Sequence, residues 1–246
     1  MVFPEIRAGH GLSLRAPALW ADTAIYFSLA SQFHDRDNGK SIQEHCGVEL
    51  GPPPVLQEYL GATHTLTAAH LPFRVVAENR PDFEGLRHLL CINAQHLSAE
   101  DAERIRNFVR DGGTLLATGL TSLQTPDGRS SGDFALSDVL GVSFTGQFCP
   151  SVHYLALSEN SYVSCQASAP LVRATGATVR AKLNVPLFPP GDAERYASIH
   201  SNPPGRDTEF VGLSEHAFGR GRAWYLASPV LAEHEHDAQL RFAMDL

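Results

Sequence analysis

The turn over residues 117–121 is the first place in the sequence where residue types suggest chemistry. It follows a short apolar strand predicted over 114–117 and contains Thr118, Gly119 and Thr121. Hydrolases of the α/β class hold a nucleophilic Ser, Cys or Asp at the apex of such a turn, flanked by small residues. Here glycine stands at the apex, and the neighbouring hydroxyls have no adjacent base in sequence. The pattern favours an ordinary strand-to-loop turn over a nucleophile elbow.

A second loop is predicted to lie at the same edge of the sheet. It follows the apolar run over 86–92 and carries Asn93 and His96. Ligands of open α/β sheets bind outside the carboxyl ends of the strands. The two loops therefore supply the candidate ligand-contacting residues, which are Asn93, His96, Thr118, Gly119 and Thr121.

Two of the four cysteines are weak nucleophile candidates. Cys91 precedes His96, and a thiol beside an imidazole can act as a nucleophile, but its position inside a predicted strand favours a buried free thiol. Cys46 lies in a predicted loop without the electropositive setting that a reactive thiol needs. The spacing contains no CxxC pair and suggests no zinc site. Cys149 and Cys165 could pair in an oxidising compartment, and the sequence leaves this open.

The densest group of metal-capable side chains spans residues 233–237. In a strand, His234 and His236 would share a face, and two histidines with Asp237 could hold a divalent ion. The same segment begins a predicted final helix, where acids simply favour the N-terminus. These three residues are weak metal candidates, and the sequence predicts no cofactor.

Composition excludes several classes of partner. The chain has 246 residues and a formal net charge of −8, and it lacks the concentrated basic face that nucleic-acid binding needs. No apolar run approaches the roughly 20 residues of a membrane-spanning helix, and no signal peptide is recognisable. We expect a cytoplasmic protein with no membrane partner.

Residues 20–120 alternate between strand and helix patterns. A helix is predicted from Pro52-Pro53-Pro54 to His70, and another from a cap at Ser98 to Gly112-Gly113, with Asp101 completing a capping box. The predicted strands are 23–29, 73–77, 86–92 and 114–117. Such alternation predicts an α/β fold with a parallel sheet between two helical layers.

After residue 120 the patterns become β-rich. Runs typical of strands cover 152–157, 162–167, 177–183, 209–216 and 222–227. The last two runs are joined by the turn FGRG. We predict one domain over 1–246, with a parallel βα core at 20–144 and a β-rich extension at 145–232 that returns to the sheet.

The order of these segments resembles a known family. The stretches "LSAEDAERIRNFVRDGGTLLATGLTSLQTPDGRSSGDFALSDVLGVSF", "HSNPPGRD" and "FGRGRAWYLASPV" are similar to the middle, trimerisation, domain of β-galactosidases of glycoside hydrolase family forty-two and related glycosidases. The matching segments span roughly residues 20 to 232. The resemblance implies a class I glutamine-amidotransferase-like fold with a flavodoxin-type three-layer sheet. In amidotransferases the corresponding turn holds a cysteine, whereas this chain has Gly119.

The resemblance also implies a function. In that family the domain follows a catalytic barrel, which needs about 250 residues of its own and has no room here. The chain alone is therefore not expected to be an enzyme, and as part of one it would belong to a glycoside hydrolase. We expect a non-catalytic domain that assembles an oligomer or shapes a carbohydrate site. Its expected partners are copies of itself, as in a trimer, a separate glycosidase barrel, or carbohydrate.

Two alternatives stay open at this point. One is a small cysteine-dependent hydrolase or amidotransferase relative that uses Cys91 or Cys46. The other is a sugar-binding module that uses loop aromatics, although aromatic side chains more often belong to the core. Those aromatics would be Phe33, Phe188, Tyr196 and Trp224.

Overall fold

The computed structural model describes residues 21–32, 54–79, 81–149, 152–188, 194 and 202–246. The expectations for Cys46, Phe33 and Tyr196 lie outside these residues. Within the described part, no helix combines the length and apolar character needed to cross a membrane.

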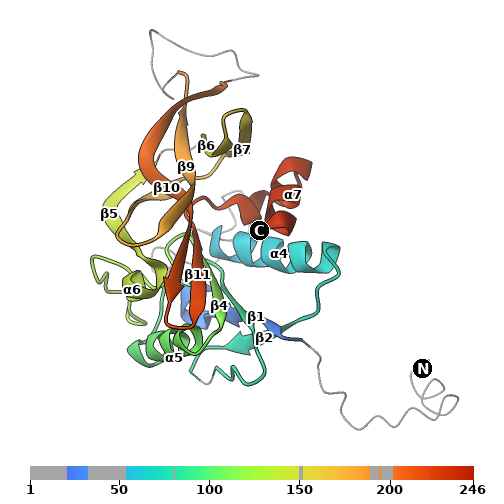
Figure 1. Ribbon diagram of the computed structural model, residues 1–246, viewed down its shortest axis with the longest axis vertical. Coiled ribbons are helices and arrows are strands. Elements are labelled where there is room, and N and C mark those ends of the chain that lie inside the picture. Colours follow the sequence, from blue (N-terminus) through green and yellow to red (C-terminus); the bar gives the residue numbers. More distant parts are fainter. Residues whose placement is uncertain (1–20, 33–53, 80, 150–151, 189–193, 195–201) are drawn as a thin grey trace, which may run out of the picture.

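Five neighbouring strands form the parallel half of a nine-stranded sheet (Figure 1). Their order is β2-β1-β3-β4-β11, and each neighbouring pair is parallel. Their bounds are Thr23–Phe27 for β1, Phe73–Ala77 for β2, His88–Cys91 for β3, Thr114–Thr118 for β4 and Gly221–Leu226 for β11. The expected α/β class is confirmed, and the last strand of the extension lies beside β4.

Side chains of the inner strands β1, β3 and β4 alternate between two buried faces. On one face Tyr26, Leu89 and Leu115 belong to the core cluster that also contains Ile105. On the other face Ile25 packs in a cluster with Ala62 of the opposite helix layer. Burial on both faces explains why the strands read as nearly continuous apolar runs rather than alternating ones.

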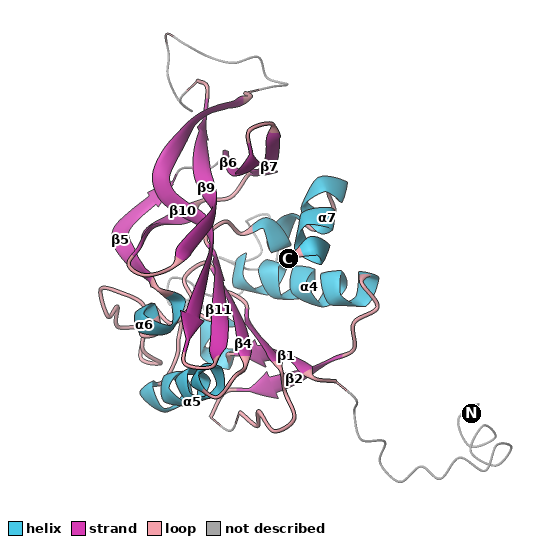
Figure 2. Ribbon diagram, viewed as in Figure 1, coloured by secondary structure: helices cyan, strands magenta, loops and turns pink. Residues whose placement is uncertain are grey.

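Helices cover both faces of the parallel strands (Figure 2). On one side lie α4 (Pro54–Ala68), the 3-10 turn η1 (Val230–Glu233) and α7 (Asp237–Asp245), while α5 (Ala99–Arg110) lies on the other. The short helix α6 (Ser137–Leu140) joins the core on the α5 side, and α2 (Leu29–Gln32) follows β1. The helices expected after residues 54 and 98 are thus present.

The buried face of α4 includes an acid. Glu58 is 1% exposed, whereas the apolar Leu60 is 46% exposed. The reason is a contact with a distant segment: a Cβ at Gly61 would come within 1.7 Å of the Leu231 carbonyl oxygen. Because η1 packs at this glycine, the helix turns its Val55, Glu58 and Ala62 side inward.

The other four strands continue the sheet in antiparallel pairing. They follow β11 in the order β10-β9-β6-β7. Their bounds are Pro204–Phe218 for β10, Thr178–Pro186 for β9, His153–Ser158 for β6 and Ser161–Cys165 for β7. The FGRG turn joins β10 to β11, with Phe218 paired to Gly221 and a left-handed φ of +61° at Gly219.

Two strands were not recognised in the sequence. β5 (Val142–Cys149) and β8 (Ala169–Ala174) form a separate antiparallel pair. Their register shifts between Phe144 and Phe148, around Gly146 with φ +80°. This irregularity breaks the period-two alternation by which a strand is recognised.

The first turn of α5 ties the helix to the sheet. Ser98 caps the helix as expected, with Oγ accepting from the Asp101 amide at 3.0 Å. The Asp101 carboxylate instead accepts from the Tyr26 hydroxyl at 2.7 Å and the Asn79 amide at 3.1 Å. The expected capping box is therefore wrong in its second half, because the acid binds the strand β1 and not the cap.

We predict that Tyr26→Phe lowers the free energy of unfolding by about 1–3 kcal/mol, because it removes a donor from a buried carboxylate. Urea unfolding measures the loss. The matched control is Tyr162→Phe, since Tyr162 is 37% exposed and its hydroxyl bonds a nearby carbonyl of its own turn. We expect that control to change stability by less than about 0.5 kcal/mol. Equal effects of the two variants would contradict the role of the Tyr26–Asp101 bond.

Candidate functional site

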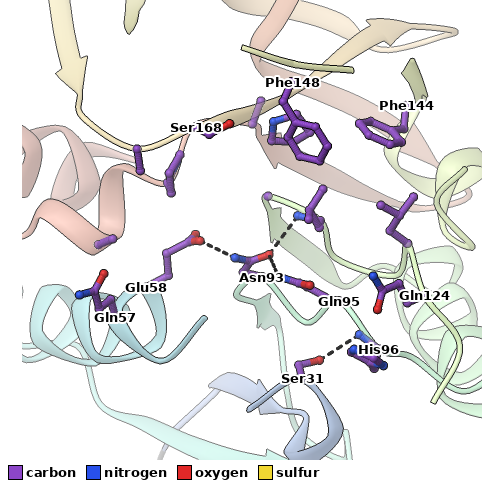
Figure 3. A pocket seen from close by; sticks show the side chains of 18 residues that line it. Ser31, Gln57, Glu58, Asn93, Gln95, His96, Gln124, Phe144, Phe148 and Ser168 are labelled. Carbon is purple, nitrogen blue, oxygen red and sulfur yellow. Dashed lines mark hydrogen bonds between the residues drawn. The ribbon is translucent and has the colours of Figure 1, made fainter. Parts of the chain in front are cut away.

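A cavity of about 680 Å³ lies at the carboxyl ends of the parallel strands. Its floor includes the loops after β3 and β4, and α4 closes one side through Gln57 and Glu58. Figure 3 shows Phe144 and Phe148 of β5 on the side opposite Asn93. The cavity therefore lies at the sheet edge where the sequence predicted ligand-contacting loops. The strand β5, which was not predicted, contributes to its lining.

A buried carboxylate connects α4 to the ends of two strands. Asn93 Nδ2 donates to Glu58 Oε1 at 2.6 Å, and the Thr118 hydroxyl donates to Glu58 Oε2 at 3.1 Å. The Asn93 amide N–H in turn donates to Thr118 Oγ1 at 2.9 Å. Glu58, Asn93 and Thr118 are 1%, 6% and 0% exposed. The three side chains form a closed network at the base of the cavity.

Burial raises the pKa of Glu58 from its ordinary 4.5 to about 7. The loss of hydration disfavours the charged form, and the hydrogen bonds from Thr118 and Asn93 offset only part of this cost. A carboxyl group with a perturbed pKa in a concave pocket is a common property of binding and catalytic sites.

Gly119 makes room for Asn93. Its φ is +55°, and a Cβ there would come within 2.9 Å of Asn93 Oδ1. That oxygen accepts from the Leu120 amide at 3.1 Å, while the Tyr225 hydroxyl donates to the Gly119 carbonyl at 2.7 Å. The glycine therefore leaves room for the side chain of Asn93 from the loop after β3, which presents an amide to the cavity where an elbow would present a nucleophile.

The five predicted ligand-contacting residues fall into two groups. Asn93, His96 and Gly119 line the cavity. Thr118 and Thr121 are fully buried beneath it. The Thr121 hydroxyl accepts from the Ala94 amide at 3.1 Å and lies 2.8 Å from the Thr118 carbonyl oxygen. These two threonines support the loops and do not reach the cavity.

His96 is held by backbone and serine contacts. The Ser31 hydroxyl accepts from the His96 amide at 2.9 Å, and His96 Nδ1 lies 3.1 Å from the Thr125 carbonyl oxygen. A carbonyl only accepts, so Nδ1 carries a proton, and Nε2 is an acceptor in the neutral ring.

The three cysteines that the structure describes do not have the surroundings of a nucleophile. Cys91 is fully buried in the core cluster on the α5 side, and burial, with a further contribution from Asp101, raises its pKa well above the ordinary value. Its thiol is therefore protonated at neutral pH. Cys149 and Cys165 are free and buried, so the disulfide left open by the sequence is not formed.

The histidines of the C-terminal segment do not gather around a metal position. Across the ranges that the structure describes, no group of three or more His, Cys, Asp or Glu side chains is placed to hold an ion. The His234 ring contacts that of His64 edge to face, with centroids 5.0 Å apart. His236 is the N-cap residue of α7, and Asp237 lies in the first turn of that helix.

Several cavity residues were missed by sequence reasoning. They are Ser31, Gln57, Glu58, Gln95, Gln124, Phe144 and Phe148. Glu58 had a readable signal, because it lies three residues after Val55 and four before Ala62, on one helix face. An acid within an apolar helix stripe is rare without a partner. The glutamines and phenylalanines gave no comparable signal.

The fold and site define a class of protein: an α/β domain with a polar cavity at its strand ends and glycine where an elbow nucleophile would stand. The model of the β-galactosidase trimerisation domain family matches residues 21–245. The chain therefore belongs to the β-galactosidase trimerisation domain family. No curated protein matches it in sequence.

Solved structures similar to this chain are parts of larger glycosidases. An α-L-fucosidase, isoenzyme 2 from Paenibacillus thiaminolyticus, has a TM-score of 0.71 at 18% identity. The alignment covers 99% of this chain and 34% of the fucosidase chain. A β-galactosidase from Bacillus circulans sp. alkalophilus has a TM-score of 0.65 at 17% identity. The alignment covers 91% of this chain and 30% of the β-galactosidase chain. The chain thus spans about a third of these enzymes.

We predict that Glu58 makes stability fall as pH rises from about 4.5 to about 7. In this window the folded state binds more protons than the unfolded state, so the free energy of unfolding decreases with pH. Urea unfolding at several pH values measures this, with Glu58→Gln as the comparison because an amide of similar shape does not titrate. The difference in stability between the wild type and the variant should decline by about 3 kcal/mol across the window. A difference independent of pH would show that Glu58 titrates normally.

Proposed function

We propose that this chain is a non-catalytic α/β domain that assembles glycosidase-type proteins into oligomers. Membership of the trimerisation-domain family carries the proposal. It is supported by the strand-end turn, where Gly119 lies at the apex and the hydroxyl of Thr118 is buried against Glu58. The partners we propose are further copies of the chain, as in a trimer, or a separate glycosidase barrel.

The cysteine-dependent alternative has weaker support. A thiolate nucleophile needs access to substrate and a lowered pKa, and burial moves Cys91 in the opposite direction. Cys46 lies outside the described residues. The assembly role requires no reactive side chain.

We also propose a finer classification of the fold. The strand order β2-β1-β3-β4-β11 corresponds to the 2-1-3-4-5 order of flavodoxin-type sheets, which supports a flavodoxin-like, glutamine-amidotransferase-like class. The free, buried cysteines support a reducing compartment, and we propose a cytoplasmic location.

We expect the chain in solution to have three times its 26.7 kDa mass. Family membership motivates this prediction, and size exclusion with light scattering over a concentration series measures the mass. A dilution series that separates trimer from smaller species would give the association constant. A monomer at every concentration would contradict self-assembly through this domain.

The non-catalytic part of the proposal has its own test. The chain alone should not hydrolyse aryl-galactosides or aryl-fucosides above the rate of buffer. Release of the aryl group, followed by absorbance, measures hydrolysis. Turnover that persists through repeated purification and follows the chain in size exclusion would contradict the proposal, whatever the oligomeric state.

A further inference from the structure

The cavity at the strand ends has the dimensions of a small-molecule site. Its volume of about 680 Å³ falls within the roughly 300–1,000 Å³ typical of ligand pockets. It lies at the carboxyl edge of the parallel strands, where open α/β sheets bind their ligands. The cavity is lined by residues of one chain, so a ligand site in it does not depend on the assembly role.

The polar lining favours a ligand with many hydroxyl groups. Gln57, Gln95 and Gln124 contribute partly exposed carboxamides, each of which can donate and accept hydrogen bonds. Sugar hydroxyls also do both, so each amide can satisfy a hydroxyl in either direction. A wholly apolar ligand would displace water from these amides without replacing its hydrogen bonds, which is costly.

The charges of the lining favour a neutral ligand. Among the described residues around the cavity there is no lysine or arginine, and the His96 imidazole is 7% exposed with its Nδ1 bonded to the Thr125 carbonyl, so a carboxylate or phosphate would find no permanent cation. Glu58 is 1% exposed, and both its carboxyl oxygens accept hydrogen bonds from within the protein. An amino acid would bring two charges, and neither has an accessible counterpart.

One side of the cavity is aromatic. Phe144 and Phe148 pack edge to face with centroids 5.5 Å apart, and Phe148 is 49% exposed. Figure 3 shows both rings across the cavity from Asn93 and Gln95. A pyranose ring has a face of C–H groups and a rim of hydroxyls, so it can place its apolar face on a phenyl ring and its hydroxyls on the amides.

The floor of the cavity is set before any ligand arrives. The Asn93 side chain is fixed at both ends. Its Nδ2 donates to Glu58, and its Oδ1 accepts a hydrogen bond from the Leu120 backbone N–H at 3.1 Å. Gln95 Nε2 lies 3.4 Å from the same oxygen. A fixed floor lowers the entropy cost of binding because few groups must be ordered. We propose that this cavity binds a neutral monosaccharide, with Phe148 as the stacking surface and Gln124 among its hydrogen-bonding groups.

The test is ligand-observed saturation-transfer NMR on the whole chain, with titrations for dissociation constants. The neutral probes are D-galactose, D-glucose and D-mannose, and the charged ones are D-glucuronate, D-glucosamine and L-glutamine. We expect at least one neutral sugar to bind, and each charged probe to bind at least about tenfold more weakly, because its charge is desolvated without a partner.

Variants locate the site. Phe148→Ala should weaken binding about threefold to tenfold and Gln124→Ala about twofold to tenfold, from the usual worth of a stacked ring and of a hydrogen bond. Tyr162→Ala removes another exposed aromatic, on β7 and outside the cavity lining, and should leave binding unchanged. Circular dichroism confirms that each variant folds.

Three outcomes would overturn the proposal. They are no binding of any neutral sugar, binding that both cavity variants leave unchanged, and preferential binding of L-glutamine or another charged probe. The solution mass is measured on the same samples, so a failed sugar site is distinguishable from failed assembly.

Discussion

The Glu58 carboxylate is the interaction on which the carboxyl edge of the sheet depends. It is buried in α4 and accepts hydrogen bonds from Asn93, which follows β3, and from Thr118, which ends β4. A single side chain therefore bonds a helix layer to two strand ends. The position of Asn93 in turn requires Gly119, since a Cβ there would come within 2.9 Å of its Oδ1. Helix, strand ends and turn are thus determined together.

The turn after β4 shows how an α/β domain can have a cavity at its strand ends without a nucleophile at the turn. A nucleophile elbow projects a reactive side chain upward from the strand end. Here the residue at that place has no side chain, and the amide of Asn93 from the neighbouring loop fills the space. The hydroxyl of Thr118 is directed toward Glu58 and away from the cavity. The result is a floor of fixed hydrogen-bonding groups in place of a reactive one.

Local patterns in the sequence predicted the central elements. The strands β1, β3 and β4 are apolar runs because both their faces are buried, and the cap at Ser98 is a contact within one turn. What depended on distant segments was not predictable. The buried side of α4 is decided by Leu231, which meets Gly61 across 170 residues of sequence. The strand β5 was hidden by its irregular register, and the phenylalanines of the cavity belong to it.

The same distinction applies within the site. Asn93, His96 and Gly119 could be named from sequence because strand ends converge at one edge of a parallel sheet. Glu58 could not be joined to them, because its partners lie 35 and 60 residues away and helix periodicity gives no information about the opposite layer. The acid Glu58 on the apolar side of a predicted helix indicates that a polar partner exists. It does not indicate which residue that partner is.

Burying an acid is not the most stable way to join a helix to a sheet. Replacing a buried charged group by a well-packed apolar one is often neutral or stabilising, because the desolvation cost is avoided. An apolar contact, however, has no direction and would leave the amide of Asn93 free to rotate. The Glu58 carboxylate accepts a hydrogen bond from Asn93 Nδ2 and so fixes the side-chain amide. Asn93 Oδ1 is then placed to accept from the Leu120 backbone N–H. The desolvation cost of burying Glu58 is reflected in its raised pKa of about 7. In return, the hydrogen bonds of the carboxylate give the cavity floor a defined shape.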